Sequence, residues 1–205
     1  MLKGVMFWVL GVAVLLGGGW AVCPDAQCVL IDSDRVGLGL AHALRAVWLD
    51  RLMSWVTWLG SLRLLLPLAG LAAWFLLRDG RRREAGFVML ALLGSSALGH
   101  LAKFWVARPR PDLFPVGLAM PETWSYPSSH AMQATAVACA LFLVARRRGA
   151  AWSVPLGFAV LLVGVSRIYL QLHFPSDVIA GTLAAALWVG GLHALVFGER
   201  SPAPR

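Results

Sequence analysis

Charged side chains are scarce in this sequence. Of the 205 residues, 14% are Asp, Glu, Lys or Arg and 59% are hydrophobic, and the mean hydropathy is +0.73. Soluble globular domains carry about a quarter charged residues, so this composition excludes an ordinary water-soluble domain. We expect an integral membrane protein whose main solvent is lipid.

Cysteine is also scarce, with three residues in the chain. Cys139 lies inside an apolar stretch, where a small packing residue is the simplest interpretation. Cys23 and Cys28 follow the first apolar stretch, and they can form a short-loop disulfide or remain free thiols. No cysteine pattern suggests metal ligation, so we expect neither a metal nor another cofactor.

Six apolar stretches have about the length that a helix needs to cross roughly 30 Å of hydrocarbon. They lie near 4–22, 62–77, 86–106, 129–145, 152–172 and 177–197. We therefore predict an all-α, polytopic membrane protein with six transmembrane helices, forming a single domain over residues 1–205 without repeats.

A seventh apolar stretch, 36–60, contains His42, Arg45, Asp50 and Arg51. Charged and aromatic side chains of this kind favour the membrane surface, so we predict an interfacial helix between the first and second spans. The alternative is a true span that tolerates a few polar residues.

The basic residues predict the orientation in the membrane. Arginine-rich loops at 78–83 and 146–148, together with Lys3 and the last arginines, fall on one side of a six-span arrangement. Short cytoplasmic loops collect Lys and Arg, so this side is predicted to be cytoplasmic. A nucleic-acid partner is not expected, because the arginines flank apolar spans and form no single basic stripe. The first 23 residues also resemble a signal peptide, but their apolar run is long and no convincing cleavage site follows.

Three polar clusters remain, and all fall on the opposite side. Lys103 and Arg110 end the third span, the segment 126–130 (YPSSH) opens the fourth, and a third cluster lies between the fifth and sixth spans, formed by Arg167, His173 and Asp177. An ionisable cluster at one membrane face is a functional site by default.

The residue types in these clusters indicate phosphate chemistry. Lys103, Arg110 and Arg167 provide three cations with few carboxylates nearby, and guanidinium groups bind phosphate oxygens in pairs. Pro127 favours the first turn of a helix, so the amides near Ser128, Ser129 and His130 are expected to form an anion cradle.

The two histidines suggest acid–base and nucleophilic roles. His130 stands where a general acid would stand, and Asp177 can fix the tautomer of His173 across a turn that contains Pro175.

These clusters resemble the motifs of the type 2 phosphatidic acid phosphatase (PAP2) superfamily, which includes vanadium haloperoxidases and bacterial acid phosphatases. The pattern Lys-x6-Arg-Pro is met by Lys103 and Arg110-Pro111, and Pro-Ser-Gly-His by Pro127-Ser128-Ser129-His130. The pattern Ser-Arg-x5-His-x3-Asp is met by Ser166-Arg167, His173 and Asp177. Order and spacing match over roughly residues 100–181, and Ser129 replaces the glycine of the second motif.

The resemblance implies a metal-independent phosphohydrolase with a PAP2-type helical core. His173 would attack phosphorus to form a phosphohistidine, Asp177 would orient His173, and His130 would protonate the leaving group and then activate water. The transferring phosphoryl group would be stabilised by Lys103, Arg110, Arg167, Ser128 and Ser129. Arg108 matches no catalytic position and is expected to contact lipid headgroups or the surface. For Arg63 and His100 we expect snorkelling or helix-capping roles.

The expected substrate is a membrane lipid phosphate in a bacterial inner membrane, with the site facing the periplasmic or extracellular side. Undecaprenyl diphosphate is slightly favoured over phosphatidylglycerol phosphate, phosphatidate and a lipid A phosphate. A phosphotransferase that uses the same intermediate and a non-catalytic lipid-phosphate binding or transport protein are the alternatives. The sequence predicts nothing about the oligomeric state.

Overall fold

Helices form the whole of the described secondary structure. The computed structural model describes residues 2–115, 120–145 and 153–198. Its α-helices are α1 (Leu2–Val22), α2 (Asp32–Ala43), α3 (Val47–Val56), α4 (Leu62–Arg78), α5 (Arg82–Val106), α6 (Ser129–Ala145), α7 (Ser153–Tyr169) and α8 (Pro175–Phe197); the 3-10 helices are η1 (Pro24–Ala26) and η2 (Thr57–Gly60).

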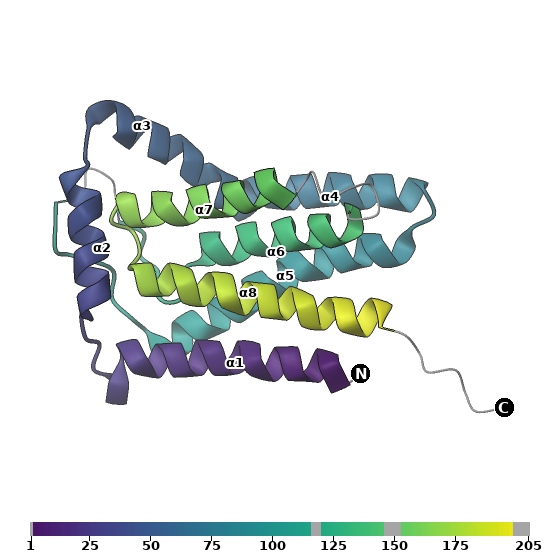
Figure 1. The fold of residues 1–205 in the computed structure, drawn as a ribbon, viewed down its shortest axis with the longest axis horizontal. Helices are drawn as coiled ribbons and strands as arrows, with labels where there is room; N and C mark the ends of the chain where they lie inside the picture. Colours follow the sequence, from purple (N-terminus) through teal and green to yellow (C-terminus); the bar gives the residue numbers. More distant parts are fainter. Residues whose placement is uncertain (1, 116–119, 146–152, 199–205) are drawn as a thin grey trace.

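The long helices lie side by side as a bundle (Figure 1). Helix α6 packs against α5, α7 and α8, while α1 packs against α8 and α4 against α5. Helix α2 lies across one end of the bundle, and α3 leads obliquely from α2 towards α4 (Figure 1). The all-α prediction is confirmed for the described residues.

Each of the six predicted apolar stretches is helical, but the six-span count is not confirmed. Helices α1, α5 and α8 are each long and apolar enough to cross a membrane by themselves. The pair Val47–Gly60 and Leu62–Arg78, bent by 45°, is a fourth candidate as a broken span or re-entrant loop. Helices α6 and α7 have 17 residues each, or about 26 Å, slightly less than the roughly 30 Å hydrocarbon layer.

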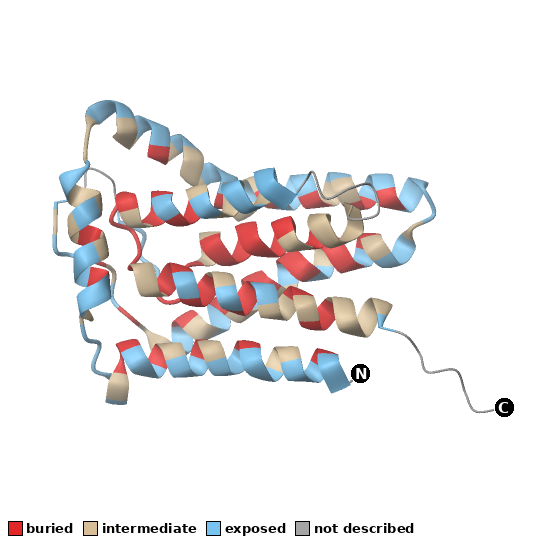
Figure 2. Ribbon diagram, viewed as in Figure 1, coloured by how far each residue is buried: buried red, intermediate tan, exposed pale blue. Residues whose placement is uncertain are grey.

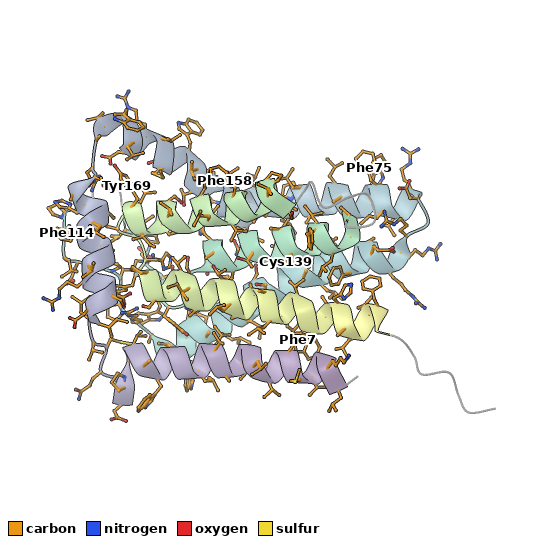
Figure 3. All side chains as sticks on the ribbon, in the orientation of Figure 1. Phe7, Phe75, Phe114, Cys139, Phe158 and Tyr169 are labelled. Atoms are coloured by element: carbon orange, nitrogen blue, oxygen red, sulfur yellow. A yellow bond between two sulfur atoms is a disulfide. The ribbon has the colours of Figure 1, made fainter. Side chains whose placement is uncertain are left out.

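The single helix predicted over 36–60 is wrong. This segment contains α2, which begins at Asp32, and α3, which continues through η2 towards α4. The helices separate at Leu44–Ala46, where Arg45 turns to pair with Asp50 at 3.0 Å. The Ala46 amide donates to the Tyr169 hydroxyl, which itself donates to Asp50 Oδ1 at 2.8 Å. These contacts hold the break against the end of α7, near the labelled Tyr169 of Figure 3.

The core is built around α6, much of which is buried (Figure 2), and many residues of this helix are small. Ala131, Ala136 and Ala140 are fully buried, which lets neighbouring helices approach closely. Cys139 is a free thiol on the same helix and packs at the edge of this core, as predicted (Figure 3). The outer faces of the bundle expose large apolar side chains, as expected of a surface that faces lipid.

Helix α1 anchors the loop that precedes α6. The buried Tyr126 hydroxyl lies within hydrogen-bond distance of the Val14 and Leu15 carbonyl oxygens, at 3.2 and 3.0 Å. A Cβ atom at Gly18 would lie 2.4 Å from that hydroxyl oxygen, so only glycine admits this approach. Just beyond α1, Cys23 and Cys28 form a disulfide, which decides the alternative that the sequence left open.

The three motifs come together at one end of the bundle. The end of α5, the start of α6, the end of α7 and the start of α8 all lie at the end that α2 crosses (Figure 1). The arginine-rich turn after α4 lies at the opposite end. The second arginine-rich loop, 146–148, falls outside the described residues.

Candidate active site

A pocket of about 680 Å³ opens where the motifs meet. Six of the eight predicted site residues line it: Lys103, Arg110, Ser129, His130, Arg167 and His173. The other two, Ser128 and Asp177, are fully buried behind its wall. Residues up to 70 positions apart in sequence therefore contribute to one cavity, as the motif analysis predicts.

The spacing of the first motif follows from how α5 ends. Ala107 adopts a left-handed conformation with φ of 50°, and its amide donates to the Lys103 carbonyl oxygen at 2.9 Å. This cap stops the helix and redirects the chain, so Lys103 on the last turn and Arg110 beyond it reach the same pocket. Lys103 donates to the carbonyl oxygens of Trp124 and Ser125 and is 6% exposed.

Arg110 is held by a set of oxygen acceptors around its guanidinium. Nε donates to the Thr123 carbonyl oxygen at 2.8 Å, and Nη2 to the Thr123 hydroxyl at 2.9 Å. Nη1 donates to the Leu172 carbonyl oxygen at 2.6 Å. These acceptors are uncharged, so the positive charge of Arg110 remains available to an anion in the pocket.

The third motif wraps around the end of α7. Gln171 adopts a left-handed conformation with φ of 56°, and the Arg167 carbonyl oxygen accepts from the amides of both Leu172 and His173. The five residues between Arg167 and His173 therefore form a turn that returns the chain to the pocket. Arg167 donates to the Thr57 hydroxyl at 2.8 Å. Its buried Nε has no hydrogen-bond partner among the described residues.

The hydrogen bonds of His173 define its tautomer. Arg110 Nη1 lies 3.3 Å from Nε2, and because a guanidinium can only donate, Nε2 must be the accepting nitrogen. The proton then resides on Nδ1, which lies 3.4 Å from Asp177 Oδ2. Burial, and next the nearby cations with Arg167 first, hold the pKa of His173 well below its ordinary value. The imidazole is neutral at neutral pH, with its lone pair on the pocket side.

Asp177 is fixed from several directions. Its Oδ2 accepts from the Phe174 amide at 3.0 Å and from the Ser125 hydroxyl at 2.5 Å. Pro175 begins α8, so the His173–Asp177 contact spans the turn before the helix and its first residues, as expected. Ser125 is a residue that the motifs did not identify, although it directly precedes the YPSSH segment.

The anticipated cradle sits one residue later than predicted. The Ser128 carbonyl oxygen accepts the first helical bond of α6, from the Met132 amide at 3.0 Å, so the unpaired first-turn amides are those after Ser128. The Ser128 amide itself donates to the Asp177 carbonyl oxygen at 3.1 Å and is not available to a ligand. Ser129 has no positive φ, so serine in place of the family glycine introduces no backbone strain.

Arg108 is not a surface or headgroup contact, and that prediction is wrong. Its side chain is 1% exposed and forms ion pairs with Asp34 at 2.8 Å and Asp177 at 2.7 Å. Two carboxylates compensate the cost of burying the guanidinium. Sequence motifs gave no indication of Asp34, because it lies on α2, far from the motifs in sequence.

Two residues for which the sequence predicts only snorkelling or helix-capping roles also lie in the pocket wall. Arg63, near the start of α4, and His100, on α5, both line the pocket.

Within residues 2–115, 120–145 and 153–198, no three His, Cys, Asp or Glu side chains cluster as metal ligands would.

Comparison with known proteins agrees with this geometry. The family model of the PAP2 superfamily matches residues 84–201. Phosphatidylglycerophosphatase B of Bacillus subtilis is 34% identical over 73% of this chain and 76% of its own length. Undecaprenyl-diphosphatase of Sulfolobus acidocaldarius is 34% identical over 55% of each chain.

Solved structures resemble the whole fold. The crystal structure of a transmembrane PAP2-type phosphatidylglycerolphosphate phosphatase from Bacillus subtilis superposes with a TM-score of 0.74 at 27% identity, covering 97% of this chain and 96% of that one. The crystal structure of Aquifex aeolicus LpxE gives a TM-score of 0.64 at 25% identity, covering 81% of this chain and 99% of the other. The family resemblance predicted from the three motifs is confirmed: this chain belongs to the PAP2 superfamily and is a membrane phosphatase.

Proposed function

We propose that the protein is a metal-independent phosphatase of an envelope lipid that works through a phosphohistidine on His173. The observation that carries the proposal is the position of His173: its Nε2 lies 3.3 Å from the donor Arg110 Nη1, and the residue lines a pocket together with Lys103, Arg110 and Arg167. A nucleophile surrounded by cations suits a phosphoryl group, whose charge those cations stabilise in the transition state.

The reaction would proceed in two steps. In the first, Nε2 of His173 forms a bond to phosphorus while the bond to the lipid oxygen breaks, and His130 donates a proton to that oxygen. The imidazole gains positive charge, which Asp177 stabilises through the Nδ1 proton. In the second step His130 takes a proton from water, the water oxygen bonds to phosphorus, and the N–P bond breaks to release inorganic phosphate.

The binding roles follow from position. Lys103, Arg110 and Arg167 would hold the phosphoryl oxygens, joined by the first-turn amides from Ser129 onward. Arg167 Nε is a buried donor without a partner among the described residues, and a phosphate oxygen would satisfy it. Ser128 is proposed in a supporting role, since its buried hydroxyl does not line the pocket.

The substrate is proposed to carry a second anionic group. A terminal phosphate bears a charge of about −1.5 to −2, which Lys103, Arg110 and Arg167 can already neutralise. Arg63 adds a further cation to the same pocket, so a diphosphate or a second phosphate in the headgroup would complete the match. Undecaprenyl diphosphate and phosphatidylglycerol phosphate fit this description, whereas phosphatidate carries a single phosphate. Relatives named for the first two substrates agree with it.

The site is proposed to face the periplasmic or extracellular side of a bacterial inner membrane. Two observations support this orientation: the arginine-rich turn after α4 lies at the opposite end of the bundle, and the Cys23–Cys28 disulfide, a bond of oxidising compartments, lies beyond α1 at the site's end. We retain six membrane crossings, with α2 at the membrane surface, as part of this proposal.

Phosphate release by detergent-purified protein tests the function. Undecaprenyl diphosphate, phosphatidylglycerol phosphate, phosphatidate and lipid A are supplied in parallel, with and without EDTA, beside the His173→Ala variant. We expect release from a two-phosphate lipid, unchanged by EDTA and lost in the variant. Loss of activity in EDTA with recovery in Mg²⁺ would contradict the metal-independent mechanism.

The alternatives give different results in the same assay. A phosphotransferase would release little inorganic phosphate with or without an acceptor; when a lipid acceptor with a free hydroxyl is added, the phosphoryl group would appear on that acceptor. A binding or transport protein would show lipid binding without release, and His173→Ala would alter little.

A further inference from the structure

Behind the nucleophile lies a buried chain of charges that the motifs do not include. Asp34 and Asp177 are 0% exposed and Arg108 is 1% exposed. Arg108 Nη2 donates to Asp34 Oδ2 at 2.8 Å, and Nη1 donates to Asp177 Oδ1 at 2.7 Å. One guanidinium therefore bridges two carboxylates, and the second of them contacts the proton of His173.

Asp34 is held at this place by the start of α8. Its Oδ1 accepts from the Ser176 amide at 2.9 Å, and its Oδ2 from the Ser176 hydroxyl at 2.7 Å. Helix α2 is thereby joined to the residue directly before Asp177. Asp34 lies outside the segment 84–201 that the family model matches, so its role is not implied by the family motifs.

Arg108 is equally well fixed. Its Nη1 also donates to the Ser176 hydroxyl at 2.8 Å, and its guanidinium carbon lies 3.8 Å from the centre of the Phe174 ring. The Arg108 carbonyl oxygen accepts from the Ser125 amide at 2.8 Å, and the Ser125 hydroxyl bonds to Asp177. Arg108 thus sets the position of both groups that surround Nδ1 of His173.

The net charge of the group formed by Asp34, Arg108 and Asp177 affects catalysis. With both carboxylates ionised and Arg108 protonated, the three groups carry a net charge of −1. Asp34 takes up part of the Arg108 charge, and without it the whole cation would face Asp177. Because charges interact strongly in a buried site, Asp177 would then stabilise a positive imidazole less well.

We propose that Asp34 and Arg108 are positioning residues that act on His173 through Asp177. Arg108 holds the Asp177 carboxylate against Nδ1, and Asp34 balances Arg108 so that Asp177 keeps its negative charge for the imidazolium that forms on phosphorylation. Helix α2 is therefore part of the catalytic apparatus. This inference rests on the proposed phosphohistidine mechanism.

The first test is Asp34→Asn, a substitution of nearly the same shape that removes one negative charge. We expect kcat to fall about 10- to 100-fold, as for other groups that orient a reacting side chain. KM should stay within about twofold, because no pocket cation contacts Asp34. An unchanged kcat in folded protein overturns the inference.

The second test uses the double variant Asp34→Asn/Arg108→Gln. Arg108→Gln alone leaves two buried carboxylates without their cation and is expected to lower kcat more than Asp34→Asn does. The double variant restores a net charge of −1, so its kcat should exceed that of Arg108→Gln alone. If Asp34 and Arg108 had merely structural roles, the decreases in kcat of the two single variants would combine in the double variant. A double variant with a lower kcat than both single variants would therefore contradict the charge balance. If Arg108→Gln does not fold, the double variant is compared with Asp34→Asn, and a kcat at least equal to that of Asp34→Asn is expected.

Asp50→Asn is the matched control. Like Asp34, Asp50 lies in the N-terminal part of the chain and pairs with an arginine. Asp50 contacts Arg45 and Tyr169, however, and not Asp177. Its kcat should equal that of the wild type even if its melting temperature falls. Wild-type protein without phosphate release would refute the proposed function itself, whereas an active wild type with an unaffected Asp34→Asn variant would refute only the role of Asp34.

Discussion

His173 has two charged sides that differ in kind. On the pocket side lie Lys103, Arg110 and Arg167, and the described lining of the pocket contains no Asp or Glu. On the rear side, Arg108 is already paired with two carboxylates. The same type of side chain therefore has two different surroundings: the pocket cations have no carboxylate beside them in the described lining, whereas the rear cation is neutralised inside the protein.

The largest decrease in kcat is expected for His173→Ala, because this variant lacks the side chain that lies between the pocket cations and the rear charges. Loss of the nucleophile is expected to lower kcat by about 10⁴-fold or more. Binding should persist, because the pocket cations remain in place. The measurements are phosphate release and, by calorimetry, affinity for the lipid. A variant that retains more than a tenth of wild-type turnover would exclude His173 as the nucleophile.

His130→Ala tests the pocket side alone, through proton transfer to the leaving group. We expect kcat for a lipid substrate to fall about 10²- to 10⁴-fold. An aryl phosphate with an acidic leaving group needs no such proton, so its rate of phosphoenzyme formation should fall much less. Rapid-quench kinetics on both substrates check this. Equal losses for the two substrates would assign His130 a role other than general acid.

The pocket cations should also be visible in the pH dependence. Burial is the main cause of the lowered pKa of His173, and Arg167 is the first of the neighbouring charges. Removing this like charge in Arg167→Gln lets the pKa of His173 rise towards the ordinary imidazole value. The nucleophile is then protonated at higher pH, and the acid limb of kcat/KM should move to higher pH.

Profiles of wild type and Arg167→Gln are measured on the same substrate, so ionisation of the substrate cancels in the comparison. An acid limb that stays in place or moves to lower pH would show that Arg167 does not set the protonation of the nucleophile.

The smallest effect is expected from packing beside the pocket. A Cβ atom at Gly60 would lie 2.6 Å from Val163 Cγ1 and 3.0 Å from His130 Cβ. Overpacking of this kind costs about 1–3 kcal/mol, and Gly60→Ala should displace His130 and lower kcat several-fold. Gly70→Ala, where a Cβ meets nothing within 4 Å, is the control. Equal activity of the two variants would show that η2 shifts to accommodate the added Cβ atom without displacing His130.

Much of the fold could be predicted because lipid imposes a simple requirement on the sequence. The six apolar stretches of membrane length correspond to helices at the expected positions, namely α1, α4, α5, α6, α7 and α8. The segment 36–60 was harder, because its break at Leu44–Ala46 is fixed by Tyr169, a residue more than 100 positions away. Tertiary contacts of this kind leave no local pattern.

The residues on the pocket side of His173 could be predicted from the sequence, whereas those on its rear side could not. Lys103, Arg110, His130, Arg167 and His173 were predictable, since each lies at a fixed spacing within a motif and the helix ends bring the motifs together. The rear side was not. Arg108 lies within the first motif but has no motif role of its own, and Asp34 reaches it only because α2 crosses the end of the bundle.

Trapping the phosphoenzyme tests the central claim most directly. Lipid labelled with ³²P in its terminal phosphate is mixed with wild type and with His173→Ala, quenched in base, and the protein is separated and analysed. The account predicts label on wild type that survives base and is lost in acid, as an N–P bond requires, located on the peptide that contains His173 and absent from the variant. Turnover of the labelled lipid without label on the protein at any quench time, or label in the variant, would contradict it.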